Sequence, residues 1–208
     1  MTRSFIYEAV APEQPSYSHV WFNPQAFSCL EKFANKSNIN FLEIGCFEGY
    51  GTNYFIDNFL GGTNSTITCV DPWIKYSEST VTGMSEWDDV INQETFNVFR
   101  RNTDQNSAKI TIRRGLSKNI LPSLNGFFHF ILIDGDHSEE AVWLDAIMSF
   151  RLLHSGGIMI FDDYDWNIGK KSPKLAVDRF VEEYKDVIYY NQIGNQIIVE
   201  KIAANLQA

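Results

Sequence analysis

Apolar and polar positions along the chain fall into blocks that predict helices and strands in turn. Helical spacing begins after Asn23-Pro24, a cap followed by a first-turn proline, and is expected to end near Asn38. Short apolar runs then alternate with stretches of helical spacing. The predicted strands are residues 40–44, 66–70, 110–113, 127–133 and 158–161, and the further predicted helices are residues 50–60, 86–102, 138 to the Gly156-Gly157 pair, and 173–184.

The end of the chain has a different pattern. Residues 187–191 and 196–200 are two short runs separated by a turn containing Gly194, which predicts an antiparallel hairpin. Residues 127–133 are almost continuously apolar, as is typical of a strand covered by helices on both faces. Five strands alternating with helices, followed by a hairpin, predict a doubly wound α/β sheet.

Composition narrows the class of protein. With 208 residues, 44% of them hydrophobic, the chain favours one folded domain and excludes disorder by composition. The 17 basic and 26 acidic side chains give a net charge of -9, which disfavours nucleic acid and anionic membranes as partners.

Cys29, Cys46 and Cys69 are odd in number and widely spaced, which favours neither a disulfide framework nor a zinc site. The first residues lack the apolar core of a signal peptide, and no apolar run approaches the roughly 18 to 20 residues of a membrane span. We expect a cytoplasmic protein with no membrane partner.

Acidic residues follow most of the predicted strands. In doubly wound sheets, ligands bind beyond the carboxyl ends of the strands. In chain order the strand-end segments are Glu43 to Gly49, Asp71-Pro72-Trp73, Gly115-Leu116-Ser117, Asp134 to His137, and Asp162-Asp163. The candidate chemistry therefore gathers at one rim of the sheet.

Gly45 and Gly49 flank the first turn from strand to helix, where missing side chains let a ligand approach the backbone. A dinucleotide fingerprint needs G-x-G-x-x-G, but Phe47 stands where its second glycine would be. Asp71 follows Gly45 by 26 residues, near where a carboxylate accepts the hydroxyls of an adenosine ribose. The pattern indicates an adenosine ligand without requiring a pyrophosphate.

The segments FLEIGCFEGYGT, CVDPW, ILIDGDHSEEA and GGIMIFDDY together resemble the class I S-adenosylmethionine-dependent methyltransferases. The resemblance covers roughly residues 23 to 201, and it is closest to the small branch that includes metal-assisted catechol-type and sugar O-methyltransferases. It implies a Rossmann-like, seven-stranded sheet of order 3-2-1-4-5-7-6, mostly parallel with an antiparallel C-terminal hairpin. It also implies S-adenosyl-L-methionine as cofactor.

The resemblance further implies a role for each strand-end segment. It places Glu43, Gly45 and Gly49 around the methionine part of the cofactor and Asp71 on the ribose, and it assigns Cys46, Phe47 and Asp134 to the cofactor site as well. The turn Gly115, Leu116, Ser117 would meet the edge of the adenine ring. Trp73 would stack on adenine, with an ordinary packed tryptophan as an equal alternative. The glycines and Asp71 also have a simpler interpretation as turn-forming residues.

Asp134, Asp162 and Asp163 end neighbouring predicted strands, so three carboxylates are expected to lie close together. Crowded carboxylates raise one another's pKa, and a hard divalent cation such as Mg²⁺ relieves the repulsion. The resemblance assigns these three residues as the metal ligands. That branch usually has Asp-Asn at the end of the fifth strand, where this chain has Asp162-Asp163, so Asp163 departs from the pattern and adds a negative charge.

His137 stands where the same branch commonly has a lysine base. An imidazole titrates near neutrality, so His137 is the predicted catalytic base, acting beside Asp134 on a metal-assisted hydroxyl. The hydroxyl oxygen would then attack the sulfonium methyl group in line. The simpler alternatives are that Asp136 or His137 caps the helix after Ser138 and that Asp162-Asp163 bind loop amides. His129 is expected to be a core residue and His154 to lie near a helix end.

Residues 1–22 and the loop from Ile74 to Trp87 lie outside the common fold. We therefore divide the chain into an N-terminal lid or packing segment, 1–22, and a methyltransferase domain, 23–208. The aromatic residues of the first segment suit a flat or sugar-like acceptor. Aromatic residues in a terminal segment also pack against their own domain or a second subunit, so a homodimer is an open alternative.

The leading hypothesis is thus a methyltransferase acting on the hydroxyl of a small molecule, assisted by a divalent metal. The alternatives are an NAD(P)-dependent oxidoreductase, disfavoured by Phe47, and a non-catalytic module that binds a nucleoside.

Overall fold

The computed structural model describes residues 14–74, 93–167 and 172–202. Its seven strands form one sheet in the order β3-β2-β1-β4-β5-β7-β6, as the resemblance implied. The strands are β1 (Asn40–Ile44), β2 (Thr66–Asp71), β3 (Ile110–Arg114), β4 (Phe128–Ile133), β5 (Leu153–Phe161), β6 (Ile188–Ile193) and β7 (Gln196–Lys201). All pairs from β3 to β5 are parallel, whereas β7 runs antiparallel to both β5 and β6. The predicted fold class is confirmed.

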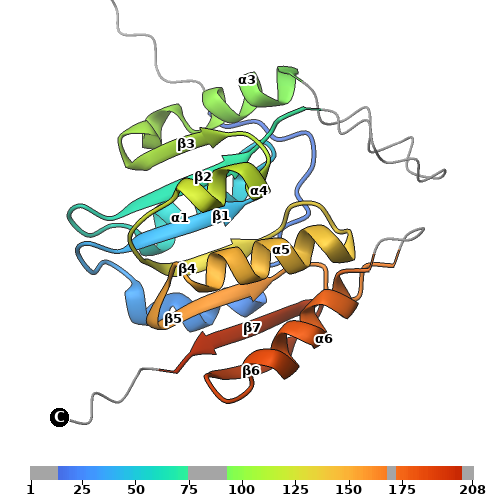
Figure 1. Ribbon diagram of the computed structural model, residues 1–208. Coiled ribbons are helices and arrows are strands. Elements are labelled where there is room, and N and C mark those ends of the chain that lie inside the picture. Colours follow the sequence, from blue (N-terminus) through green and yellow to red (C-terminus); the bar gives the residue numbers. More distant parts are fainter. Residues whose placement is uncertain (1–13, 75–92, 168–171, 203–208) are drawn as a thin grey trace, which may run out of the picture.

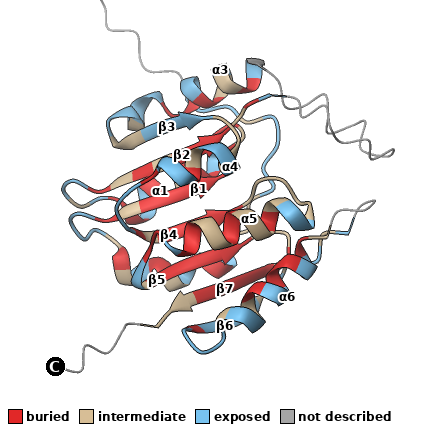
Figure 2. Ribbon diagram, viewed as in Figure 1, coloured by how far each residue is buried: buried red, intermediate tan, exposed pale blue. Residues whose placement is uncertain are grey.

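Helices cover both faces of this sheet (Figure 1). They are α1 (Tyr50–Phe59), α3 (Gln93–Asn102), α4 (Ser117–Ile120), α5 (Glu139–Phe150) and α6 (Pro173–Tyr184), with 3-10 segments η1 (Pro24–Phe33), η2 (Asp104–Lys109) and η3 (Leu121–Ser123). Strand residues alternate between two cores. Phe41 and Phe130 pack with η1, α1 and α3, whereas Leu42 and Ile131 pack on the side of α4, α5 and α6. Figure 2 shows the result, with buried central strands between the exposed edge strands β3 and β6.

Several boundaries differ from the predictions. The first helical segment is a 3-10 helix that ends at Phe33 rather than near Asn38, because Asn35 and Asn38 adopt left-handed backbone conformations. Helix α5 ends at Phe150, before the Gly156-Gly157 pair. Strand β5 begins at Leu153, and its register with β4 is irregular between the partners of Phe128 and Phe130. The glycines therefore lie in an irregular stretch of strand and do not end a helix.

Two further predictions concern histidines. His129 accepts a hydrogen bond from the Asn40 backbone at 3.1 Å, as expected for a satisfied residue at the edge of the core. His154 lies exposed on β5 and stacks on His129 with ring centroids 5.0 Å apart, so its placement near a helix end was wrong.

The start of the predicted helix at Glu86 and the loop from residue 75 to Trp87 fall outside the described residues. No helix in the described part of the chain combines the length and apolarity that a membrane crossing needs.

Candidate functional site

The turn from β1 to α1 brings the backbone of two strands into close contact. Gly45 has a φ of +87°, and a β-carbon placed on it would lie 1.9 Å from the carbonyl oxygen of Asp134 at the end of β4. Gly49, the N-cap of α1, also has a φ of +87°. Only glycine fits at position 45, because a side chain there would strain the backbone and would also overlap with the end of β4. The predicted glycine turn is therefore present and lies against Asp134.

We expect Gly45→Ala to destabilise the protein by several kcal/mol, because the new methyl group would force β1 and β4 apart. Gly156→Ala is the matched control: Gly156 also has a positive φ, +75°, but a β-carbon there would meet nothing within 4 Å. The control should lose only about 1 kcal/mol, the cost of the backbone conformation. Urea denaturation of both variants measures the difference, and equal losses would show that the close approach to Asp134 is unimportant.

Asp71 holds the same turn from the neighbouring strand. Its Oδ2 accepts hydrogen bonds from the backbone N–H groups of Cys46 (2.8 Å) and Phe47 (3.1 Å), and its Oδ1 accepts one from Trp73 N–H (2.6 Å). Burial raises the pKa of this carboxyl, and the three N–H donors oppose that rise. A carboxylate has about four lone-pair sites. Asp71 thus fixes the glycine turn and keeps acceptor capacity for a ligand.

Glu43 lies below the turn, with only 2% of its surface exposed. The hydroxyl of Thr52 donates to its Oε2, and the thiols of Cys46 and Cys69 lie beside it. Burial raises the pKa of Glu43 to about 8, although the hydrogen bond from Thr52 opposes the rise. At neutral pH this side chain is therefore mostly a neutral acid within the core.

This shift predicts a pH-dependent stability. An unfolded glutamate releases its proton near pH 4.5, whereas folded Glu43 holds it up to about pH 8. Between these values the folded state binds the extra proton, so the free energy of unfolding falls as pH rises, by up to about 1.4 kcal/mol per pH unit. Glu43→Gln should remove this component. Urea denaturation at pH 5.5, 7 and 8.5 would compare the two proteins, and parallel pH profiles would contradict the assignment.

Trp73 does not face the rim. Its side chain is fully buried, its ring packs on Phe96 and Phe99 of α3, and its Nε1 donates to the carbonyl of Phe47 at 2.8 Å. This is the packed tryptophan of the sequence analysis and not the adenine-stacking one. Stacking on adenine would require the ring to leave the core, so we do not include Trp73 in the cofactor site.

The turn after β3 lies next to Asp71. The N–H of Gly115 donates to the Asp71 carbonyl at 3.0 Å, Leu116 is the N-cap of α4, and Ser117 is the first residue of that helix. The hydroxyl of Ser117 hydrogen-bonds to the side chain of Asp145 on α5. The predicted adenine-edge segment therefore follows the ribose candidate directly along the rim.

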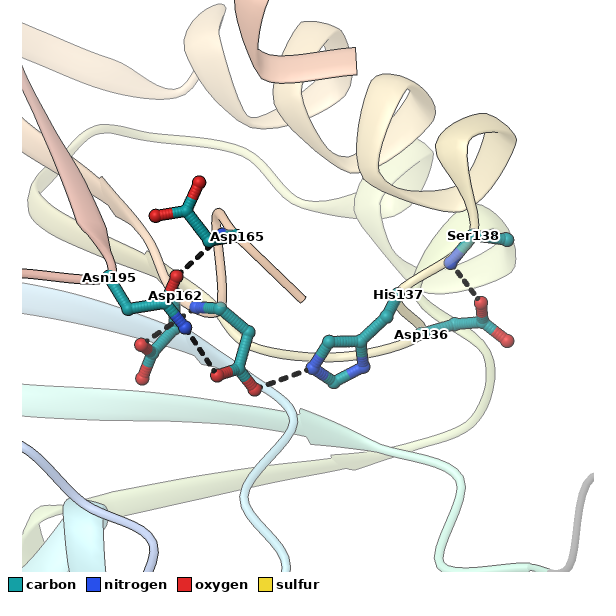
Figure 3. A network of polar contacts seen from close by, with 7 residues as sticks. Asp136, His137, Ser138, Asp162, Asp165 and Asn195 are labelled. Carbon is teal, nitrogen blue, oxygen red and sulfur yellow. Dashed lines mark hydrogen bonds and ion pairs between the residues drawn. The ribbon is translucent and has the colours of Figure 1, made fainter. Parts of the chain in front are cut away.

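At the ends of β4 and β5, Asp134, His137 and Asp163 each offer a ligand atom, and these atoms lie within 4.8 Å of one another. His137 Nε2 is 2.8 Å from Asp163 Oδ2, and Asn195 donates to Asp163 Oδ1 at 3.2 Å. Figure 3 shows His137, Asp162 and Asn195 at this common rim. Residue 163 has a φ of +53°, a strained conformation for an aspartate that turns the chain here.

Asp162 lies beside this group and is not one of its members. Its Oδ1 accepts a hydrogen bond from the Asp163 backbone at 2.9 Å. Burial raises the pKa of Asp162 to about 6, and burial together with the charges of Asp162 and Asp163 raises the pKa of Asp134 well above its usual range. Buried, mutually repelling carboxylates beside an imidazole are a donor set that fits a divalent cation. Of the three predicted ligands, the structure brings Asp134 and Asp163 together with His137, and Asp162 lies beside them.

The helix after this rim begins as predicted. Ser138 caps α5 by accepting a hydrogen bond from Ala141 N–H, and Asp136 accepts one from Ser138 N–H at 2.7 Å. Asp136 is therefore the residue that shapes the turn into the helix, while His137 turns to Asp163. The cap of α5 is therefore Ser138 itself, and Asp136 acts on the backbone of that cap rather than on the helix.

The residues that attach the N-terminal segment to the glycine turn were not predicted from the sequence. Glu48 accepts hydrogen bonds from the backbone and hydroxyl of Ser18 at 2.6 and 2.8 Å. Asn102 donates to the carbonyls of Glu48 and Ser16, both at 3.0 Å. Trp21, 52% exposed, packs on Phe47 with ring centroids 5.0 Å apart. Residues 14–22 thus run along the rim (Figure 1), and the division of the chain at residue 22 stays a prediction.

The chain thus has a doubly wound sheet with a glycine turn and an acid at the end of the next strand, the place where such sheets bind ligands. A family model described as a methyltransferase domain matches residues 42–164, more than half of the chain. The chain belongs to this methyltransferase family. The match includes every strand-end segment singled out above, from Glu43 to Asp163.

The individual relatives are distant. Protein R132 of Acanthamoeba polyphaga mimivirus is 27% identical over 141 residues, and the match covers 66% of this chain and 58% of that protein. A Bacillus cereus O-methyltransferase in complex with S-adenosylhomocysteine superimposes with a TM-score of 0.60 at 16% identity, covering 85% of this chain and 77% of that one. MycE of the mycinamycin biosynthetic pathway, in complex with Mg and S-adenosylhomocysteine, gives 0.59 at 15% identity, covering 92% and 51%. A candidate rRNA methylase from Clostridium thermocellum gives 0.63 at 14% identity, covering 88% and 100%. At these identities the structures support the fold.

Proposed function

We propose that this protein transfers a methyl group from S-adenosylmethionine to a hydroxyl oxygen of a small molecule, with help from a divalent cation. One observation carries the proposal: the group of Asp134, His137 and Asp163 lies at the same rim as the glycine turn. Asp134 belongs to this group, and its backbone carbonyl lies against Gly45 of the turn. A methyl donor bound at the turn would therefore end beside a base and a cation site.

The cofactor would occupy the rim from β4 to β3. Its methionine part would lie over Gly45, Cys46, Phe47 and Gly49, with Glu43 beneath and Asp134 alongside, and its ribose hydroxyls would reach Asp71. Its base would meet the turn from Gly115 to Ser117. The backbone around this path is already ordered by the hydrogen bonds of Asp71 and by the N-terminal segment, so little reorganisation is needed on binding.

The cation would be held by Asp134 and Asp163, with Asp162 nearby. When bound, Mg²⁺ would supply a Lewis acid that makes the acceptor hydroxyl more acidic, and S-adenosylmethionine would supply a methyl group on a sulfonium sulfur. His137 would donate Nε2–H to Asp163 and so keep Nδ1 free to accept the hydroxyl proton. Asp163 would then stabilise the imidazolium. The acceptor oxygen would attack the methyl carbon as the carbon–sulfur bond breaks, leaving S-adenosylhomocysteine.

A small-molecule acceptor fits this chain better than RNA does, because the net charge of -9 opposes a phosphate backbone. The exposed Trp21 beside Phe47 offers an aromatic surface near the rim for a flat or sugar-like acceptor. A cytoplasmic location and a homodimer are further predictions of the same account.

Isothermal titration calorimetry tests the proposal. S-adenosylhomocysteine is expected to bind one site per chain, and Mg²⁺ is expected to bind with heat that disappears in Asp163→Asn. NAD⁺ should give no heat. Heat for NAD⁺ but none for S-adenosylhomocysteine would favour the oxidoreductase. If S-adenosylhomocysteine binds equally well with and without Mg²⁺, and Mg²⁺ alone gives no heat, the metal would be removed from the mechanism.

A further inference from the structure

The turn of the β6–β7 hairpin lies against the loop that carries Asp163. Between Ile193, the end of β6, and Gln196, the start of β7, only Gly194 and Asn195 remain. Gly194 has a φ of +58°, as is common for glycine at the first position of a two-residue hairpin turn. Because β7 pairs with β5 as far as the end of β5, the turn lies where the chain leaves β5 for the loop.

Asn195 contacts three consecutive residues of this loop. Its carbonyl accepts a hydrogen bond from Tyr164 N–H at 2.9 Å, and its Oδ1 accepts one from Asp165 N–H at 2.5 Å. Its Nδ2 donates to Asp163 Oδ1 at 3.2 Å. Figure 3 shows the side chain of Asn195 beside Asp165 and on the same side of the rim as His137. One residue of the turn therefore holds the loop through both its backbone and its side chain.

The loop needs this support because Asp163 has a φ of +53°, a conformation that persists only where the surroundings fix it. Two local hydrogen bonds fix its backbone: its N–H donates to Asp162 Oδ1 at 2.9 Å, and its carbonyl accepts from Trp166 N–H at 2.8 Å. Neither of them orients the carboxylate. Within the described part of the chain, the carboxylate has its hydrogen bonds with His137 and Asn195.

These two partners divide the oxygens of Asp163 between them. Oδ2 lies 2.8 Å from His137 Nε2, and Oδ1 accepts from the amide of Asn195. A neutral amide orients the carboxylate without cancelling its charge, whereas a lysine or arginine would pair with it. Among the described residues no lysine or arginine forms a salt bridge with Asp163. A carboxylate has about four lone-pair sites, so Asp163 keeps acceptor capacity for a cation shared with Asp134.

We propose that Asn195 is a positioning residue that acts through Asp163. It fixes the carboxylate so that one oxygen faces His137 while the group stays in place to hold a divalent cation. This inference rests on the proposed function for the roles of His137 and the cation. Its hydrogen bonds involve the protein alone, so the positioning itself can be tested on the protein without cation or cofactor.

Crystal structures of the cation-free protein test the positioning. In Asn195→Ala the Asp163 carboxylate should leave His137 Nε2, because its other oxygen has lost its donor. Asn195→Asp is a second variant if the alanine variant does not fold: it keeps an acceptor for Asp165 N–H but presents an oxygen to Asp163, so the carboxylate should again turn away. Gln192→Ala is the matched control, since Gln192 donates to the Gly194 carbonyl of the same turn, and it should leave Asp163 in place. A carboxylate that stays in hydrogen-bond contact with His137 in the Asn195 variants would overturn the proposal.

Binding and turnover measurements separate this role from the proposed function. Loss of the partner that orients a ligating carboxylate lowers metal affinity or activity by about 10- to 100-fold. Calorimetry should therefore show Mg²⁺ binding weakened by this factor in Asn195→Ala and unchanged in Gln192→Ala, with S-adenosylhomocysteine affinity unchanged in both. The turnover number of Asn195→Ala should fall by a similar factor, while KM for S-adenosylmethionine stays as in the wild type.

The possible failures are distinguishable. Equal Mg²⁺ affinity in Asn195→Ala and the wild type would overturn the positioning role alone. A wild type that binds neither Mg²⁺ nor S-adenosylhomocysteine would overturn the proposed function, while a displaced Asp163 in the variant crystals would still support the positioning by Asn195.

Discussion

Replacing Asp71 with alanine is expected to weaken the binding of S-adenosylhomocysteine by at least about 100-fold. Two effects add. The substitution would remove the acceptor proposed for the ribose hydroxyls, and it would leave three backbone N–H groups, those of Cys46, Phe47 and Trp73, without their partner. Hydrogen bonds to a charged group contribute about 1.5–3 kcal/mol each, so the loss of ligand contacts alone accounts for this factor.

The two effects can be separated by measuring binding and stability together. Asp71→Asn keeps one acceptor oxygen for the glycine turn, so it should lose less stability than the alanine variant while still binding the nucleoside weakly. Asp104→Ala, which removes an exposed carboxylate and changes the net charge equally, should change neither property. Wild-type affinity in Asp71→Ala, measured by calorimetry, would contradict the placement of the ribose.

Replacing His137 with glutamine is expected to lower the turnover number by about 100- to 10,000-fold, the usual contribution of a general base. The variant should bind S-adenosylhomocysteine as the wild type does, because His137 contacts Asp163 and not the glycine turn. The measurement is a steady-state assay of methyl transfer with an acceptor found by screening small catechols and sugars.

A matched variant and a second readout separate the base from a merely structural histidine. His154→Gln changes an exposed histidine on β5 and should leave turnover unchanged. The Mg²⁺ concentration for half-maximal activity should be similar in His137→Gln and the wild type, because the carboxylates hold the cation in the proposed mechanism. Unchanged turnover in His137→Gln, or a loss that extra Mg²⁺ restores, would show that His137 is not the base.

The sheet and its rim could be predicted because their signals are local. The apolar run before Asp134 is typical of a strand buried on both faces, and parallel strands bring Asp71, Asp134 and Asp162 to one edge wherever their exact boundaries lie. The glycine at position 45 is likewise required by the approach of β4.

Other features depend on contacts between distant segments and left no local signal. Trp73 is buried because α3 packs over it, which residues 71–73 do not reveal. Asn195 reaches Asp163 only because β7 pairs with β5. The irregular start of β5 depends on its pairing with β4.

The most direct test of the central claim is a crystal structure of the protein grown with S-adenosylhomocysteine and Mg²⁺. The account predicts the nucleoside along the rim, with its ribose hydroxyls at Asp71 and its sulfur within reach of the space beside Asp134 and His137. A rim filled by the protein's own side chains, or the nucleoside bound away from Gly45, would contradict it.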